Sequence, residues 1–173
     1  MGLLKIPAKV RDYAFEAPLL RKVPDTSDAF VMLRAAQAVC KSNGFTFSEG
    51  KRKAAVTLPN IVFLPENWGI MDMANRATLI WHESVHTAQC ASLGATRYLA
   101  RYTLGVGWWL AMELEAEQQE MVCCKRLGTR YDIDDNVDRL CSGKTYRALS
   151  MFYKKQLIEN LSTEVLLKRW NSL

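Results

Sequence analysis

The chain has 173 residues, of which 49% are hydrophobic and 24% charged, a composition that is ordinary for a globular protein and excludes an intrinsically disordered one. Its formal net charge is +5, but the basic residues are scattered and form no concentrated face of the kind that binds nucleic acid. No apolar run is long enough to cross a membrane and "MGLLKIPAKVRDYAF" lacks the features of a secretion signal, so we expect a cytoplasmic protein. The length fits one domain over residues 1–173.

The first predicted elements are a helix and a small sheet. In "PDTSDAFVMLRAAQAVCKSNG", Ser27 or Asp28 can cap the start of a helix and Gly44 can end it. The runs "FTF", "KAAVTL" and "NIVFL" favour β structure and are separated by turn residues. They predict a sheet of two or three short strands.

Two long helices and a helical tail follow the sheet. The first helix is expected over residues 72–94 and the second over 108–128, and each ends at a glycine that suits a C-cap. Residues 133–170 indicate two or three shorter helices. This order predicts an α+β domain dominated by helix, with its core over about 25–128 and a helical extension over about 129–173.

The stretch "LIWHESVHTAQC" contains the only two histidines of the chain, His82 and His86. They are four positions apart on the first long helix, so both side chains project from one face and can reach one tetrahedral ion. Glu83 lies about a quarter-turn around the helix, where it can sit beside a metal without binding it. Because chance would produce this arrangement in roughly one such chain per thousand, the stretch predicts a metal site.

A tetrahedral site needs a third protein ligand, and the second long helix offers carboxylates. Cys90 is a poorer candidate, because it lies a turn further along the histidine helix. At about 100° per residue, Glu113, Glu117 and Glu120 lie on the apolar side of the second helix. Both Glu113 and Glu117 are expected to face inward one turn apart, so spacing alone does not choose between them. Glu115 falls on the opposite side and is expected to face water, among Gln118, Gln119, Val122, Lys125 and Arg126.

These motifs resemble those of the gluzincins, and among them the compact minigluzincin-type peptidases, over about residues 45–128. "HESVH" matches HExxH and "ELEAE" matches E-x-x-A-[D/E], while "HESVHTAQ" also looks like the HExxHxxQ of small bacterial and phage-associated zincin domains. The resemblance implies a zincin-like fold and one Zn²⁺ per chain, bound by His82, His86 and Glu113. It also implies that Glu117 supports a ligand, although the family usually has Asp there, so the longer side chain leaves that geometry less defined.

The function that follows is that of a zinc metallopeptidase acting on a peptide or protein. Zinc would keep one position for water and lower its pKa, and Glu83 would act as general base. The alternative is a structural zinc module that joins two helices in a larger assembly, such as a phage tail or injection machine, so that the protein is located in a virion and has protein assembly partners. Glu83 favours the enzyme, because a purely structural site has no use for a base beside an open coordination position.

Further residues have expected roles around this site. Gln89 lies on the stripe of the histidines and would either bond a ligand carboxylate or cap local backbone. "NIVFL", residues 60–64, is the candidate edge strand to which an extended substrate would add. The donor that stabilises the oxyanion would be one of Tyr98, Tyr102, Arg97 and Tyr131, which the sequence does not rank.

Overall fold

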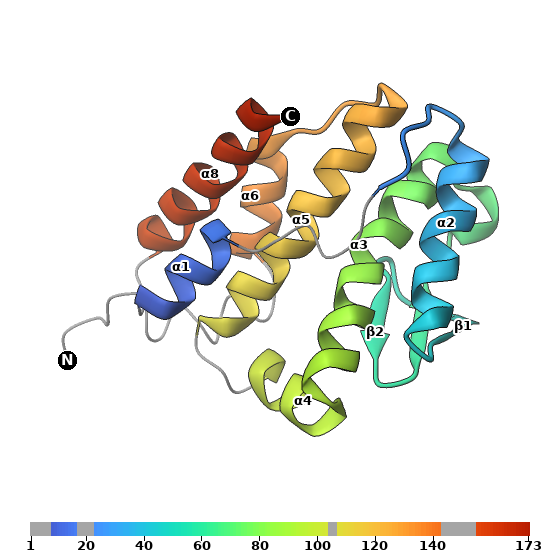
Figure 1. Ribbon diagram of the computed structural model, residues 1–173, viewed down its shortest axis with the longest axis horizontal. Helices are drawn as coiled ribbons and strands as arrows, with labels where there is room; N and C mark the ends of the chain where they lie inside the picture. Colours follow the sequence, from blue (N-terminus) through green and yellow to red (C-terminus); the bar gives the residue numbers. More distant parts are fainter. Residues whose placement is uncertain (1–7, 17–22, 104–106, 143–154) are drawn as a thin grey trace.

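The computed structural model describes residues 8–16, 23–103, 107–142 and 155–173, and helices dominate them (Figure 1). The predicted α+β class with a small sheet is confirmed. In the described part of the chain, no helix is long and apolar enough to cross a membrane. The elements in chain order are α1 (Ala8–Glu16), α2 (Ala29–Ser42), β1 (Thr46–Glu49), β2 (Val56–Leu58), β3 (Ile61–Leu64), the 3-10 turn η1 (Trp68–Ile70), α3 (Met73–Leu93), α4 (Ala95–Thr103), α5 (Trp108–Leu127), α6 (Ile133–Ser142) and α8 (Lys155–Ser172).

Capping residues set the ends of the helices around the site. The Asp28 carboxylate accepts hydrogen bonds from the first turn of α2, and the Asp72 carboxylate does the same at the start of α3. Gly94 ends α3 with φ +77° and Gly128 ends α5 with φ +65°, a left-handed region that favours glycine. Local chemistry therefore fixes both long helices close to their predicted limits.

Two helices, α1 and α4, were not expected from the sequence. After Gly94 turns the chain, α4 begins at once, and the Tyr98 amide already donates to the Gly94 carbonyl. Tyr98 and Tyr102 are four residues apart, so they lie on one face of α4, and their rings stack with centroids 5.6 Å apart. Helix α4 therefore places two tyrosines on one face, in a segment where no helix was expected from the sequence.

The sheet has the strand order β1-β3-β2, with β1 parallel and β2 antiparallel to β3. The expectation that residues 60–64 form an edge strand is therefore wrong, because β3 is paired on both sides. Strand order depends on where the connection after β1 crosses, and the period of the side chains does not encode it. Among the described strands, β2 is the edge that lies beside α3, and Thr57 at its centre is buried.

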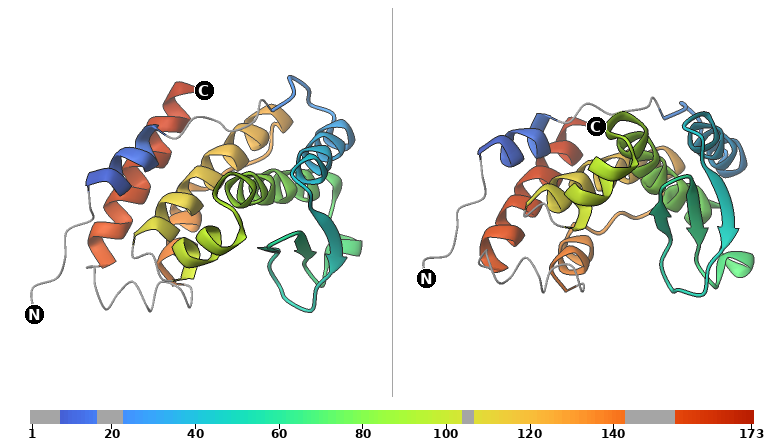
Figure 2. Two further views of the ribbon diagram at one scale, coloured as in Figure 1. Left: turned by 60° about the horizontal axis from the view of Figure 1, so that its bottom comes forward. Right: turned by 90° about the horizontal axis from the view of Figure 1, so that it is seen from below.

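Helix α5 runs between α3 on one side and α6 and α8 on the other (Figures 1 and 2), and it contributes side chains to two hydrophobic clusters. One cluster joins α5 to α2, the sheet and α3, and the other joins it to α6 and α8. The expectation that Glu115 faces water is wrong, because its side of α5 is covered by α1 and only 3% of Glu115 is exposed. The neighbours of Glu115 on that side, Gln118, Gln119 and Val122, are also buried. The sequence does not show that α5 is enclosed on both sides.

Candidate metal centre

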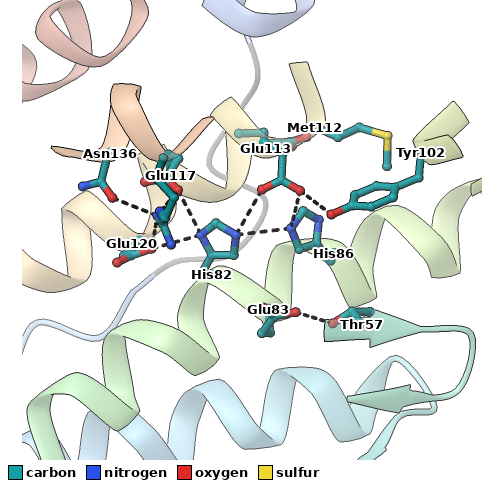
Figure 3. A network of polar contacts seen from close by, with 12 residues as sticks. Thr57, His82, Glu83, His86, Tyr102, Met112, Glu113, Glu117, Glu120 and Asn136 are labelled. Atoms are coloured by element: carbon teal, nitrogen blue, oxygen red, sulfur yellow. Dashed lines mark hydrogen bonds and ion pairs between the residues drawn. The ribbon is translucent and has the colours of Figure 1, made fainter. Parts of the chain in front are cut away.

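Two imidazole nitrogens from α3 and the carboxylate of Glu113 from α5 face one another at the centre of the domain (Figure 3). The Nε2 atoms of His82 and His86 are 3.3 Å apart. The Nε2 atom of His82 is 3.5 Å from Oε2 of Glu113, and that of His86 is 3.5 Å from Oε1 of Glu113. All three side chains are buried, with 3–8% of each residue exposed, so the predicted trio is brought together away from bulk water.

The spacing of these atoms fits a tetrahedral ion. Zinc–nitrogen and zinc–oxygen bonds of about 2.0–2.1 Å at the tetrahedral angle place neighbouring ligand atoms about 3.3–3.4 Å apart. In the structure the two nitrogens are 3.3 Å apart, and each is 3.5 Å from a different oxygen of the Glu113 carboxylate. Two nitrogens and one carboxylate are also a donor set that zinc accepts. The residues present therefore fit a zinc ion without rearrangement of either helix.

Hydrogen bonds at the other ring nitrogens select which nitrogen of each histidine faces this centre. The Nδ1 atom of His82 lies 3.0 Å from a Glu120 oxygen, and the Nδ1 atom of His86 lies 2.9 Å from Oε1 of Gln89. Both partners are acceptors, so each Nδ1 donates a hydrogen. In the neutral tautomers, both Nε2 lone pairs then face each other, an arrangement that favours a bound cation or proton.

The charges of the trio are strongly coupled. Burial lowers the pKa of His82, but hydrogen bonds to Glu113 and Glu120 outweigh it, so that pKa lies well above its ordinary value. For His86, burial is likewise outweighed by the negative charge of Glu113, and its pKa is raised. Burial raises the pKa of Glu113, but the two histidines hold it well below its ordinary value. The carboxylates of α5 therefore favour the protonated imidazoles when no metal is bound.

Glu83 lies beside the trio rather than within it. Its Oε2 accepts a 2.6 Å hydrogen bond from the hydroxyl of Thr57 on β2, and both side chains are buried. Figure 3 shows this pair on the β2 side of α3, separate from the contacts of Glu113. Glu83, Thr57 and the three facing side chains line one cavity of about 170 Å³. A carboxylate is thus fixed next to the candidate metal position without being a ligand.

Tyr102 alone among the four candidate oxyanion donors lines this cavity. Its hydroxyl donates to Oε1 of Glu113 at 2.5 Å, and burial and the charge of Glu113 raise its pKa. Tyr98 is buried and stacks on Tyr102, Tyr131 bonds Glu117, and Arg97 is exposed. Geometry therefore ranks these residues where the sequence did not.

Glu117 lies one turn beyond Glu113 on α5 and is held by the extension. Its oxygens accept hydrogen bonds from Tyr131 at 2.6 Å and from Arg139 on α6 at 2.5 Å. Burial and the nearby Glu120 raise the pKa of Glu117 to about 7. Its nearest oxygen is 3.6 Å from Nδ1 of His82, so the hydrogen bond expected from Glu117 is made by Glu120. Residues 129–142 thus contribute directly to the centre.

A second group of possible ligands shares one histidine with the first. It consists of Nδ1 of His82 with Glu117 and Glu120, whose ligand atoms lie within 4.8 Å of one another. Arg139 already places a cation between these carboxylates, 2.5 Å from one and 4.0 Å from the other. The trio with Glu113 is therefore the better metal position.

No role was predicted from the sequence for Thr57, Glu120 or Arg139. Glu120 was expected on the helical face of Glu113, but its contact with Nδ1 of His82 appears only in the structure. Thr57 lies at an inward position of an edge strand, and Arg139 comes from the extension, so no local pattern links either to the histidines. Comparisons with protein-family models, with curated proteins and with solved structures found no match. The inference about function therefore rests on the geometry of the centre and on the motifs.

Proposed function

We propose that the chain is a zinc-dependent metallopeptidase with a zincin-like fold, of the gluzincin type that its motifs resemble. The zinc would be held by His82, His86 and Glu113. One observation carries the proposal: two imidazole nitrogens and the Glu113 carboxylate face one another, with one ligand atom of each within 4.8 Å of the others, while Glu83 is held in the same cavity outside that set. A site that only stabilised the fold would not need this second, separate carboxylate.

In this proposal, each residue around the cavity has a separate role in hydrolysis. Bound zinc would supply a Lewis acid and lower the pKa of a water molecule. Glu83 would accept the proton of that water and pass it to the leaving amine. The Thr57 hydroxyl bonds one oxygen of Glu83 and so restricts its rotation toward the reacting atoms. Tyr102 bonds Glu113 and lines the cavity, which makes it the best-placed hydroxyl to approach a substrate oxygen.

A substrate chain would bind along β2. Residues 54–57 line the cavity, and β2 has β3 on one side only. An extended peptide can pair with a strand of this kind through main-chain hydrogen bonds. That pairing would bring a peptide carbonyl toward Glu83 and the histidines. A cavity of about 170 Å³ accommodates main chain and a small group, so an extended peptide suits it better than a bulky ligand.

The test is Glu83→Gln, which preserves size and removes basicity. The variant should bind one zinc per chain, as the wild type should, and lose hydrolysis of a peptide library by at least about 100-fold. Glu66→Gln is the matched control, because Glu66 is exposed outside the cavity and the change is chemically identical. Near wild-type cleavage by Glu83→Gln would refute the base role.

The same experiment addresses the structural alternative. If the wild type binds zinc with full stoichiometry and melts at a higher temperature with zinc, yet cleaves no member of the library, zinc joins α3 to α5 without chemistry. A chain that binds no zinc after refolding with the metal would overturn both functions.

A further inference from the structure

A chain of buried hydrogen bonds connects the ring of His86 to helix α1. The Nδ1 atom of His86 lies 2.9 Å from Oε1 of Gln89. The amide nitrogen of Gln89 donates to Oε2 of Glu115 at 2.9 Å, and the hydroxyl of Tyr13 donates to the same oxygen at 2.5 Å. The four residues come from α3, α5 and α1, so one end of the chain is a candidate ligand and the other lies on a separate helix.

The orientation of the Gln89 amide is determined by its partners. Its nitrogen lies within hydrogen-bond distance of two acceptors, the Met112 carbonyl at 3.1 Å and the Glu115 carboxylate at 2.9 Å. A flipped amide would place an oxygen against both of them, so the oxygen must face His86. His86 must then carry its hydrogen on Nδ1, which leaves Nε2 free to bind a metal. Gln89 therefore selects the tautomer in which His86 can be a ligand.

Glu115 in turn keeps Gln89 in place. Only 3% of Glu115 is exposed, and burying a carboxylate on the side of α5 away from the metal is unfavourable unless it is hydrogen-bonded. Its Oε2 accepts from both Gln89 and Tyr13. The Tyr13 ring is held edge-on against Trp108 at the start of α5, with centroids 5.7 Å apart. Docking of α1 through Tyr13 thus supplies the second hydrogen bond to Oε2 of Glu115.

We propose that Gln89, Glu115 and Tyr13 are positioning residues that fix the metal-binding tautomer and ring angle of His86, so that docking of α1 on α5 increases zinc affinity. None of the three touches the candidate metal position. The inference rests on the proposed zinc site but not on peptide hydrolysis, because it concerns how the site holds its metal.

Zinc affinity of the full chain, measured by competition with a chelator, tests the proposal. Gln89→Leu removes the acceptor at His86 and should weaken zinc binding about 10–100-fold, and Tyr13→Phe, at the far end, should weaken it about threefold to tenfold. Glu115→Leu should resemble Gln89→Leu. Glu115→Gln should stay within about threefold of the wild type, because one amide oxygen can accept from both donors.

The matched control is Arg11→Ala. It removes the exposed ion pair between Arg11 on α1 and Glu164 on α8, which contributes little to stability and lies outside the hydrogen-bond chain, so zinc affinity should not change. The absorption bands of Co²⁺ bound in place of zinc report the ligand geometry. They should shift in Tyr13→Phe and remain unchanged in Arg11→Ala and Glu115→Gln.

The outcomes separate this inference from the proposed function. Wild-type zinc affinity and unchanged Co²⁺ bands in Tyr13→Phe would overturn it, and so would equal losses in Glu115→Gln and Glu115→Leu. If Gln89→Leu fails to fold, Tyr13→Phe decides, because it removes a single oxygen. A wild type that binds zinc in this graded way but cleaves no peptide supports the positioning chain and refutes only the peptidase. A wild type without zinc binding overturns both.

Discussion

Arg139→Met should destabilise the metal-free protein in a way that depends on pH. Glu117 is almost wholly buried, with 1% of its side chain exposed, and the Arg139 guanidinium is 2.5 Å from its Oε1. Methionine keeps much of the apolar stem and removes the charge. The carboxylate then retains the 2.6 Å hydrogen bond from Tyr131 but loses its neighbouring cation.

The structure sets the size of this effect. Removing one partner of a fully buried ion pair costs about 3–5 kcal/mol, because an unpaired charge stays buried. The side chain of Arg139 is 55% exposed, so solvent already screens the pair, and we expect about 1–3 kcal/mol at pH 8. The pKa of Glu117 is about 7, raised above its unfolded value, and losing Arg139 raises it further. The loss of stability should therefore grow as pH rises toward and through that pKa, and should be small at pH 6, where the carboxyl is protonated.

Urea unfolding of the zinc-free protein at pH 6 and pH 8 measures this prediction. In a double-mutant cycle, Glu117→Gln should abolish most of the effect of Arg139→Met, because no buried charge is left unpaired. Arg130→Met is the control, since the pair between Arg130 and Asp132 is near the surface and 84% of the Arg130 side chain is exposed. Equal destabilisation by Arg139→Met at both pH values, or additive single effects in the cycle, would refute the reasoning.

Three further predictions concern the ligands, the base and the protons. Glu113→Ala should nearly abolish zinc binding. Glu117→Ala should weaken it about 10–100-fold and still bind zinc stoichiometrically at high zinc concentration. If titration with a chelator gives the reverse order, the ligand is Glu117, one turn further along α5. Thr57→Val, which loses the hydrogen bond to Glu83, should lower kcat about 10–100-fold with unchanged zinc affinity, and an unchanged kcat would contradict the positioning of the base. Because the pKa of His82 is raised, zinc affinity should increase from pH 6 to pH 8, while the melting temperature of the zinc-free protein should decrease. If both quantities change in the same direction, the raised pKa of His82 is contradicted.

The elements that carry the candidate ligands could be predicted because their signals are local. Asp72 and Gly94 limit α3 by capping, and the 3.6-residue period places His82 and His86 on one face. The same period correctly turned Glu113 toward the histidines. Each of these inferences uses residues within one helix, where backbone geometry converts spacing into direction.

The surroundings of the site could not be predicted, because they depend on which elements pack together. Three glutamates of α5 each accept from a tyrosine of another segment: Glu113 from α4, Glu115 from α1 and Glu117 from the residues before α6. A helical wheel predicted that Glu115 faces solvent, because most of its neighbours on that side of α5 are polar. In a helix enclosed on both sides, polar residues instead find partners across the interface.

The distribution of charge around His82 explains how the centre can be formed before a metal binds. Glu113, Glu117 and Glu120 approach that ring from α5 within 3.0–3.6 Å, and so many carboxylates would repel one another if nothing balanced them. The Arg139 guanidinium provides part of this balance, and the raised pKa values of His82, His86 and Glu117, the last to about 7, favour protonated groups among the carboxylates. A divalent ion entering the trio would replace imidazole protons with a larger charge at the same place. Zinc binding would then be an exchange of cations in a preformed site, so the main opposition to it at low pH is protonation of the ligands rather than folding.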